Sequence, residues 1–415
     1  MTRKERTIVF LLAALNFTHI LDFMIMMPLG NYLKVSSMQF SLLVASYSIS
    51  AFFSGLAIAM FIDRFDRKRS LLFAYTGFVV GTIACGFASS YGLLLTARIV
   101  AGLFGGIIGA QVLSIIADMF VYERRGRAMG AVMSGFAGAS ILGVPLSLYL
   151  TNIFKHDWHV PFLLIGSLGI IFIPLIIRYI PKMTGHIQKR ETEETPFKAL
   201  ITVCKVPAQR AALVFSALLM MGHFLIIPFI NPYLEFNKGF SKNQTPMIYL
   251  FGGIASLLSA LYLGRVSDRI GKLTVFSVSV FFSLFMVLII THMPNVSFSL
   301  VLVFFAAWFV VATGRIVTAQ AMISEVVKPE QRGSFMSING SVQQLGSGLA
   351  ALFAGIIVST EKSGKIINYS WVGYLSILVL LMSLLYGRII FRKIDVVDEK
   401  KELPVPDTEL VQETA

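Results

Sequence analysis

Three polar side chains within an otherwise apolar stretch, residues 8–28, are the ones most able to do chemistry. They are Asn16, His19 and Asp22. At about 100° of rotation per residue, a helix brings the three together within an arc of roughly 120°. Because apolar surroundings favour the neutral form of a carboxylate, Asp22 could bind and release a proton near neutral pH. An imidazole can do the same, so His19 is a second candidate. The alternative is that Asp22 forms a fixed ion pair or a polar contact at a helix end.

Two arginines also interrupt apolar stretches, Arg98 within residues 92–116 and Arg315 within residues 297–320. An ionisable group inside a long apolar segment is costly and usually faces a cavity or a partner. Arg98 could therefore accept a charge partner. Arg315 could bind an anionic or carboxylate-bearing substrate, or it could neutralise Asp22. For both arginines the alternative is a purely structural pair.

Several uncharged polar side chains in the apolar stretches could contact a substrate, although a hydrogen bond between helices is the commoner role. His223 and Asn231 share one side of a helix, and so do Asn339 and Gln343. The candidate substrate ligands are Asn16, Gln111, His223, Asn231, Arg315, Gln320, Asn339 and Gln343.

The composition indicates what kind of protein must hold these groups. Of 415 residues, 56% are apolar and 14% are charged, whereas soluble proteins have about 45–50% apolar and about 25% charged residues. So little charge cannot coat a water-exposed surface. This excludes a soluble enzyme, a nucleic-acid-binding domain, a disordered chain and a disulfide-stapled secreted module. The two cysteines are too few for a disulfide framework or a cysteine metal site, and we expect no metal and no cofactor.

Twelve apolar stretches are close to the length of about 20 residues that a helix needs to cross a bilayer. They are continuous rather than alternating, which excludes β-barrel strands. We therefore expect an all-α membrane protein with twelve transmembrane helices. The stretches cover approximately residues 8–28, 39–61, 70–89, 92–116, 129–151, 160–180, 210–232, 244–264, 273–292, 297–320, 334–357 and 369–391.

The positions of lysine and arginine predict the orientation of these helices. Most of the 35 basic residues lie at the two ends of the chain and in every second connection. Basic connections remain on the cytoplasmic side, so both termini should be cytoplasmic, in the plasma membrane or bacterial inner membrane. The net charge of +13 is thus a topology signal, and we expect no nucleic-acid partner. The other connections hold only Lys34, Lys155, Lys238, Lys242, Lys362 and Lys365.

Two loop sequences recur in the second half of the chain. The segment AMFIDRFDRKRS (59–70) is matched by GRVSDRIGKLTV (264–275), and ERRGRAM (123–129) is matched by EQRGSFM (330–336). Such repeats favour two parallel six-helix halves, as in one large class of secondary transporters. We expect a first bundle at 1–180, a cytoplasmic connector at 181–209, a second bundle at 210–393 and a disordered tail at 394–415.

The repeated loop resembles the best-known motif of the major facilitator superfamily, Gly-x-x-x-Asp-Arg-x-Gly-Lys/Arg. The second copy is complete, with Gly264, Asp268, Arg269, Gly271 and Lys272. The first copy keeps Asp63, Arg64 and Arg67, but it has Ala59 and Asp66 where the motif has glycines. The resemblance extends over essentially the whole chain and implies the major facilitator fold.

This resemblance also implies roles for charged residues at the helix ends. It pairs Arg67 with Asp118 and places Asp63 near the start of the eleventh helix, as contacts that form and break during gating. In the second half, Asp268, Lys272 and Glu325 are the counterparts. Arg64, Gly264, Arg269 and Gly271 complete the predicted gating set.

Three further segments are similar to twelve-helix drug–proton antiporters and bacterial efflux permeases. They are LDFMIMMPLG (21–30), RIVAGLFGG (98–106) and GFAGASILGVPLSLYL (135–150). The resemblance assigns Arg98 a part in proton transfer. In the third segment, Gly135, Gly138 and Gly143 would let helices approach closely, and Pro145 would kink its helix.

Together these features predict a secondary active transporter, most simply a proton-coupled exporter of a small organic molecule that works by alternating access. The alternatives are a proton-coupled importer of a nutrient, organic acid or siderophore and, more remotely, a non-transporting membrane sensor. No P-loop is found, and no nucleotide-fold glycine motif or metalloprotease motif suggests an enzyme. The expected partners are the substrate, protons and the bilayer, and we expect a monomer.

Overall fold

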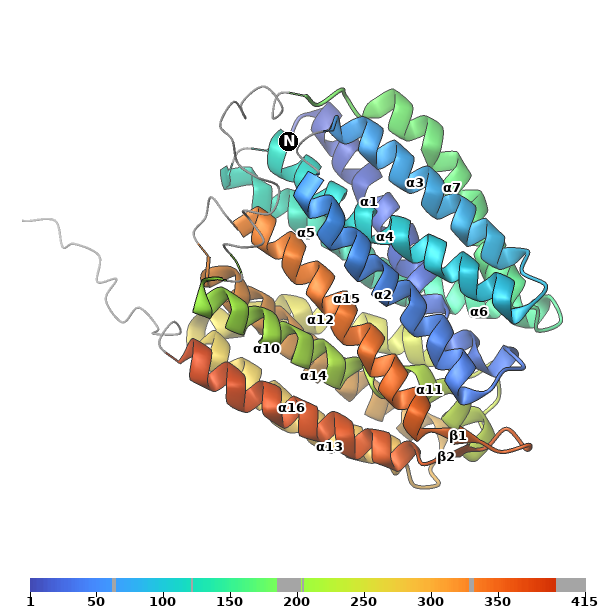
Figure 1. The fold of residues 1–415 in the computed structure, drawn as a ribbon. Coiled ribbons are helices and arrows are strands. Elements are labelled where there is room, and N and C mark those ends of the chain that lie inside the picture. Colours follow the sequence, from blue (N-terminus) through green and yellow to red (C-terminus); the bar gives the residue numbers. More distant parts are fainter. Residues whose placement is uncertain (62–64, 121, 185–202, 204, 328–331, 393–415) are drawn as a thin grey trace, which may run out of the picture.

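The computed structural model describes residues 1–61, 65–120, 122–184, 203, 205–327 and 332–392 (Figure 1). Twelve helical spans in this part are long and apolar enough to cross a membrane. The prediction of twelve transmembrane helices is therefore confirmed. Most of the connector and the whole tail lie outside the described residues, and so do Asp63 and Arg64.

The first half of the chain contains six spans. They are α1 (Arg3–Ile25), α2 (Ser37–Phe61), α3 (Arg67–Gly86), α4 (Tyr91–Met119), a fifth span of α5 (Tyr122–Gly138), η3 (Ala139–Gly143) and α6 (Val144–Ile153), and α7 (His159–Tyr179). A short helix, η1 (Pro28–Tyr32), follows α1.

The second half repeats this plan. Its spans are α10 (Pro207–Phe224) with α11 (Ile227–Pro232) and η4 (Tyr233–Asn237), then α12 (Thr245–Ile270), α13 (Lys272–Thr291), α14 (Phe298–Glu325), α15 (Arg332–Ile357) and α16 (Tyr369–Phe391). A two-stranded hairpin, β1 (Ser359–Thr360) with β2 (Ile366–Ile367), connects α15 to α16.

Local sequence signals begin and end several helices. The side chain of Thr2 accepts a hydrogen bond from the backbone of Glu5, whose carboxylate bonds back to Thr2. This capping box satisfies backbone donors that the first turn leaves free. Asp66 caps α3 in a similar way. Between α12 and α13, Gly271 has a φ of 94°, a conformation that side chains rarely adopt, which explains the glycine at this motif position.

The two halves pack against each other mainly through α2 and α15, which lie side by side in Figure 1. Small residues allow the close approach: a Cβ on Gly355 would lie 2.3 Å from Ser41, and one on Gly348 would lie 2.9 Å from Ile49. Lipid tails are as apolar as the helix surfaces, so no hydrophobic force drives the helices together in a bilayer. Tight packing of this kind is therefore a main source of helix association.

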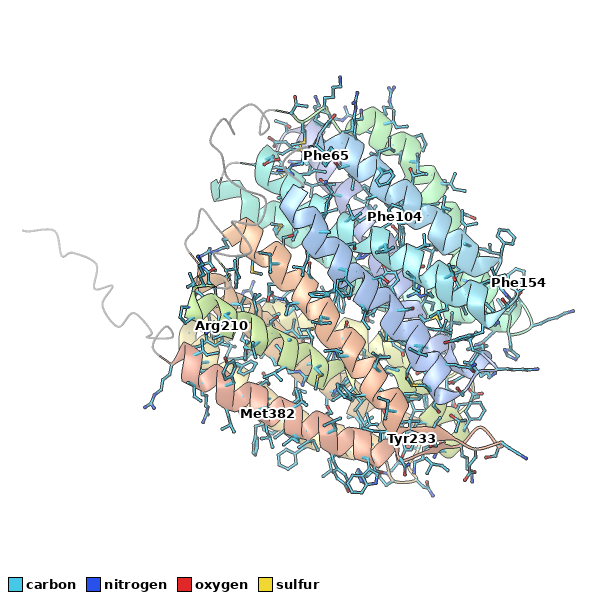
Figure 2. The ribbon with its side chains drawn as sticks, in the orientation of Figure 1. Phe65, Phe104, Phe154, Arg210, Tyr233 and Met382 are labelled. Atoms are coloured by element: carbon cyan, nitrogen blue, oxygen red, sulfur yellow. The ribbon has the colours of Figure 1, made fainter. Side chains whose placement is uncertain are left out.

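The bundle has two ends, which Figure 1 places to the left and to the right. The N-terminus and the end of α16 lie at one, which we call the proximal end. Phe154, which follows α6, and Tyr233, the first residue of η4, lie at the other, the distal end (Figure 2). Large apolar side chains such as Met382, Ile389 and Phe73 are exposed on the outside of the helices. This surface suits contact with hydrocarbon rather than with water.

The fifth span is not one regular helix, whereas the sequence predicted only a kink at Pro145. Residues Ala139–Gly143 form a π-helical segment, and Pro145 is the second residue of α6 immediately after it. A proline cannot donate a backbone hydrogen bond, and a π-helical turn is one way in which a helix accommodates such an interruption.

Candidate functional site

A buried ion pair joins the first and fourth spans. Arg98 Nη1 donates to Asp22 Oδ2 at 2.8 Å, and both side chains are 0% exposed. The same nitrogen lies 3.3 Å from the backbone oxygen of Asp22. Arg98 is thus the charge partner that Asp22 required. In this conformation the carboxylate faces no open crevice, contrary to what proton exchange on Asp22 requires.

The ion pair leaves part of its hydrogen-bonding capacity unused. Asp22 Oδ1, Arg98 Nε and Arg98 Nη2 have no hydrogen-bond partner among the described residues. A buried polar atom without a partner costs free energy. The pair therefore has hydrogen-bonding capacity that this conformation does not use.

Aromatic and imidazole rings surround the pair. The guanidinium of Arg98 lies 4.4 Å from the centre of the Tyr47 ring, and the His19 ring centre is 6.2 Å from that of Tyr47. Two glycines of α4 make room for these rings. A Cβ on Gly102 would lie 2.3 Å from the backbone oxygen of Tyr47, and one on Gly105 would lie 3.0 Å from His19. The glycine-rich segment after Arg98 therefore shapes this site.

The second buried arginine has a different environment. Arg315 Nη2 lies 2.7 Å from His223 Nδ1, and Arg315 is 0% exposed. Because a guanidinium has only donors, His223 accepts this bond and is uncharged at that nitrogen. Trp308 stacks on the imidazole with ring centres 5.2 Å apart. Arg98, rather than Arg315, neutralises Asp22, so that alternative for Arg315 is not realised.

A row of aromatic rings lies between the two arginine sites and crosses from one half to the other. Phe23 of α1 lies 5.6 Å from Tyr47 and 5.7 Å from Phe224 of α10, measured between ring centres. Phe224 in turn lies 5.2 Å from His223. The two sites therefore belong to one central region of the bundle, which the linear sequence does not reveal.

The other predicted substrate ligands fall into two groups. Three are engaged between helices: Asn16 donates to the Val132 backbone oxygen, Gln343 donates to Ser216, and Asn231 accepts from Tyr249. These contacts fit the structural alternative. Both amide atoms of Gln111, and the side-chain oxygens of Gln320 and Asn339, have no hydrogen-bond partner among the described residues.

At the proximal end the structure contains two of the implied gating pairs. Arg67 Nε donates to Asp118 Oδ2 at 2.8 Å, and Lys272 forms an ion pair with Glu325. The repeat thus places equivalent pairs in both halves. Among the remaining members, Asp268 and Arg269 are exposed, Gly264 has no heavy atom near the position of a Cβ, and Gly271 forms the turn described above.

The predicted packing glycines lie against α1. A Cβ on Gly135 would lie 3.1 Å from the Ala13 backbone oxygen, and one on Gly143 would lie 2.7 Å from Leu21. Gly138 is less crowded, with Phe17 at 3.5 Å. These contacts hold the fifth span close to the helix that carries Asp22.

A polar network at the distal end connects the two halves, and the sequence analysis did not identify it. Asn31 donates to Glu235 Oε2 at 2.5 Å, and Asn152 Nδ2 donates to the Lys242 backbone oxygen at 3.2 Å. Tyr32 donates to Asn152 at 2.6 Å, and Lys242 Nζ lies 3.6 Å from Glu235. We call these five residues the distal network.

The charges of the distal network reinforce one another. The ammonium of Lys242 lies 4.5 Å from the centre of the Tyr32 ring, an arrangement that attracts a cation. Burial and the nearby Glu235 carboxylate both raise the pKa of Tyr32 above its ordinary value. Its hydroxyl therefore stays protonated and donates to Asn152. In the sequence, Glu235 stands three residues beyond the expected end of its span, which is why it was not singled out.

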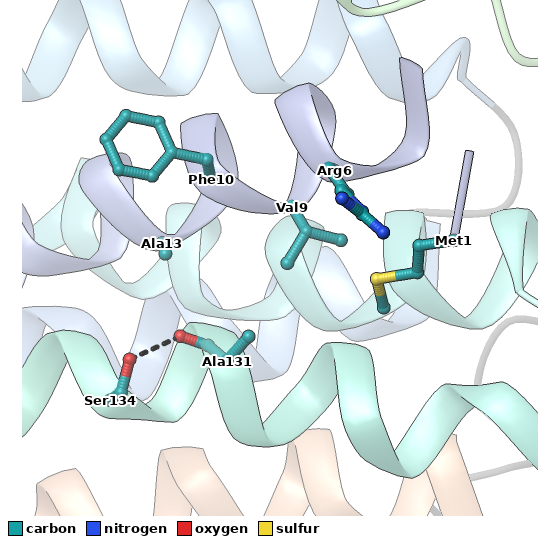
Figure 3. A pocket seen from close by; sticks show the side chains of 7 residues that line it. All are labelled: Met1, Arg6, Val9, Phe10, Ala13, Ala131 and Ser134. Atoms are coloured by element: carbon teal, nitrogen blue, oxygen red, sulfur yellow. Dashed lines mark hydrogen bonds between the residues drawn. The ribbon is translucent and has the colours of Figure 1, made fainter. Parts of the chain in front are cut away.

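A shallow groove lies between α1 and α5 near the proximal end (Figure 3). The Ser134 hydroxyl on its wall donates to the Ala131 backbone oxygen of the same helix. Phe10, on the opposite wall, is 74% exposed. None of the predicted substrate ligands lines this groove. It is lined by Met1, Arg6, Val9, Phe10, Ala13, Ala131 and Ser134.

Comparison with known families identifies the superfamily of this chain. A family model of the Major Facilitator Superfamily matches residues 7–314 and 212–412. The chain belongs to this superfamily. As a major facilitator superfamily protein it is a membrane transporter and not an enzyme. The expected family and fold are thereby confirmed.

Relatives within the superfamily are distant. The transporter YceJ of Bacillus subtilis is 23% identical over 353 residues, which cover 83% of this chain and 87% of the relative. A probable sugar efflux transporter of Helicobacter pylori is 21% identical over 369 residues, covering 87% and 90%. The solved structure of the nucleoside transporter NupG superposes with a TM-score of 0.73 at 13% identity, covering 94% of this chain and 100% of NupG.

A second solved structure has the same fold. It is a bacterial homologue of the human lysosomal transporter Spinster in an inward-facing and occupied conformation. The TM-score is 0.71 at 14% identity, over 94% of this chain and 98% of the other. At such identities the superposition supports the major facilitator fold alone.

Proposed function

We propose that this transporter exports a small organic molecule in exchange for protons, by alternating access between its two six-helix halves. The observation that carries the proposal is the buried pair of Asp22 and Arg98. Asp22 is the one carboxylate of the described residues that is 0% exposed. Burying such a pair is costly, and ionisable groups kept inside a membrane protein in spite of that cost usually serve its function.

The pair offers a means of coupling. A proton on Asp22 removes the negative charge with which its free Oδ1 could accept hydrogen bonds from a substrate. Proton binding and substrate binding would then compete for the same carboxylate, as an exchange of one for the other requires. His19, close to the same pair, is the second candidate for the proton.

Proton exchange needs a conformation in which the pair is open to water. The distal network closes one end of the bundle in the present conformation, and we propose that it opens in another. The distribution of basic residues supports a cytoplasmic proximal end and both termini inside the cell. Export rather than import is supported by relatives that are named sugar efflux transporters, and sugars are therefore the first compounds to test.

Proteoliposomes loaded with a pH-sensitive dye provide the test. Compounds from a panel of sugars and other small organic molecules are added under an imposed proton gradient, and a substrate is recognised by proton movement that requires the protein. Asp22→Asn should abolish proton movement but retain substrate counterflow. Thr18→Val is the matched control, because Thr18 is a fully buried polar residue of the same helix that, among the residues the structure describes, bonds to Leu15 and Tyr75 alone.

The direction of transport is tested with vesicles of both orientations. In inside-out vesicles an exporter accumulates substrate when the lumen is acidic. Wild-type proton movement by Asp22→Asn would contradict the coupling role. Driven uptake only into right-side-out vesicles would instead support the importer.

A further inference from the structure

The buried charges of the two halves are not balanced in the same way. In the first half, Arg98 faces the carboxylate of Asp22. In the second half, Arg315 is equally buried, but its hydrogen bond goes to an imidazole that must be neutral to accept it. No carboxylate of the described residues pairs with Arg315. The central region thus carries one guanidinium more than it has carboxylates.

The guanidinium of Arg315 also has free bonding capacity. Its Nε and Nη1 have no hydrogen-bond partner among the described residues. Glu325 of the same helix cannot serve, since it pairs with Lys272 at the helix end, about 15 Å away at 1.5 Å per residue. An uncompensated buried charge costs several kcal/mol. Such a group is expected to be stabilised by a ligand that brings the missing negative charge.

The groups around Arg315 suit an organic anion rather than a bare ion. Trp308 and Phe224 each present an aromatic ring to His223, with ring centres 5.2 Å from the imidazole in each case. His223 and Phe224 are partly exposed, whereas Trp308 and Arg315 are buried. A ligand that displaces His223 would place its charge on the guanidinium and its apolar part against the rings.

We infer that Arg315 receives the carboxylate of an organic anion, which is the transported substrate. A carboxylate matches the planar fork of a guanidinium with two parallel hydrogen bonds. His223 occupies one of these donor positions in the absence of substrate and moves aside when substrate binds. The inference rests on the proposed transport function, and it adds the chemical class of the substrate.

Equilibrium binding to the purified full-length protein tests this inference without any gradient. Trp308 serves as the reporter after Trp158 and Trp371, the other two tryptophans, are changed to Phe. The probes are sodium benzoate, its neutral isostere benzamide, and sodium chloride at the same ionic strength as the benzoate. Benzoate should change Trp308 fluorescence in a saturable manner and raise the melting temperature, and it should bind at least tenfold more tightly than benzamide.

Three variants separate a ligand-binding arginine from a structural one. Arg315→Gln should abolish the response to benzoate, and Arg315→Lys should retain part of it because the charge is preserved. In the absence of ligand, Arg315→Gln should melt at the same temperature as the parent or higher, since it removes an uncompensated buried charge. Arg98→Gln is the matched control, because it breaks a formed ion pair and should melt lower.

Each outcome bears on the inference. Equal binding of benzamide and benzoate, an equal response to chloride, unchanged benzoate binding by Arg315→Gln, or no saturable response to benzoate would each overturn it. Wild-type proton movement by Asp22→Asn would refute the proposed coupling and leave these binding results untouched. Conversely, absence of anion binding would refute this inference but would still be compatible with proton-coupled transport of a neutral compound.

Discussion

Replacement of Glu235 by alanine should open the distal end of the transporter. The carboxylate accepts a hydrogen bond from Asn31 across the two halves, and only 14% of it is exposed, so water screens the contact little. A hydrogen bond to a charged group contributes about 1.5–3 kcal/mol. The ion pair of Glu235 with Lys242 lies within the second half. It persists whether the distal end is open or closed, so it does not contribute to the free-energy difference between the two conformations.

The expected shift follows from this free energy. At 1.4 kcal/mol per tenfold change, 1.5–3 kcal/mol corresponds to a factor of roughly 10–150 in the ratio of open to closed distal ends. A conformation populated at about 1% in the parent would then rise to roughly 10–60%. Two weaker connections of the distal network remain in the variant, from Asn152 to the Lys242 backbone and from Lys242 to the Tyr32 ring. The hydroxyls of Ser37 and Thr360 also stay hydrogen-bonded across the two halves at this end. The distal end should therefore open only in part of the molecules.

Distances between spin labels on the two halves measure this shift. Labels on Lys34→Cys and Lys362→Cys, both exposed in distal loops, are introduced after Cys85 and Cys204 have been replaced by alanine. Glu235→Ala should increase the population with the longer distance.

The matched control is Asn237→Ala, which removes two hydrogen bonds to the Ile366 backbone at the same end but within one half. It should leave the ratio unchanged. A shift below about threefold for Glu235→Ala, or an equal shift for both variants, would refute the assignment of the distal network as a gate.

Two further predictions concern stability in detergent. Gly102→Ala should lower the melting temperature, since its Cβ would lie 2.3 Å from the Tyr47 backbone oxygen, whereas Gly109→Ala on the same helix has open space and should be neutral or stabilising; equal effects would contradict the packing of α2 on α4. Asp22→Asn leaves the buried guanidinium of Arg98 unpaired and should cost about 3–5 kcal/mol. Adding Arg98→Met should recover most of this loss, and a lack of recovery would show that the pair does not act as a unit.

The sequence by itself was sufficient for the fold and for the list of chemically capable residues. Long apolar stretches must satisfy their backbone polar groups internally, so in a bilayer they become helices whatever their neighbours are. The repeated loops then indicated two halves. In the same way, the position of Asp22, Arg98 and Arg315 within apolar stretches was enough to mark them, because ionisable groups are rare there.

Only the tertiary structure decided which of these residues meet. The sequence offered Arg315 as a possible partner for Asp22 and left the partner of Arg98 open, and the choice depends on how α1 packs against α4 beside Gly105. The distal network was likewise invisible, since its members come from four segments whose ends meet only when the halves close. Helix formation depends on local sequence and its solvent, whereas the pairing of charges depends on which helix faces are brought together.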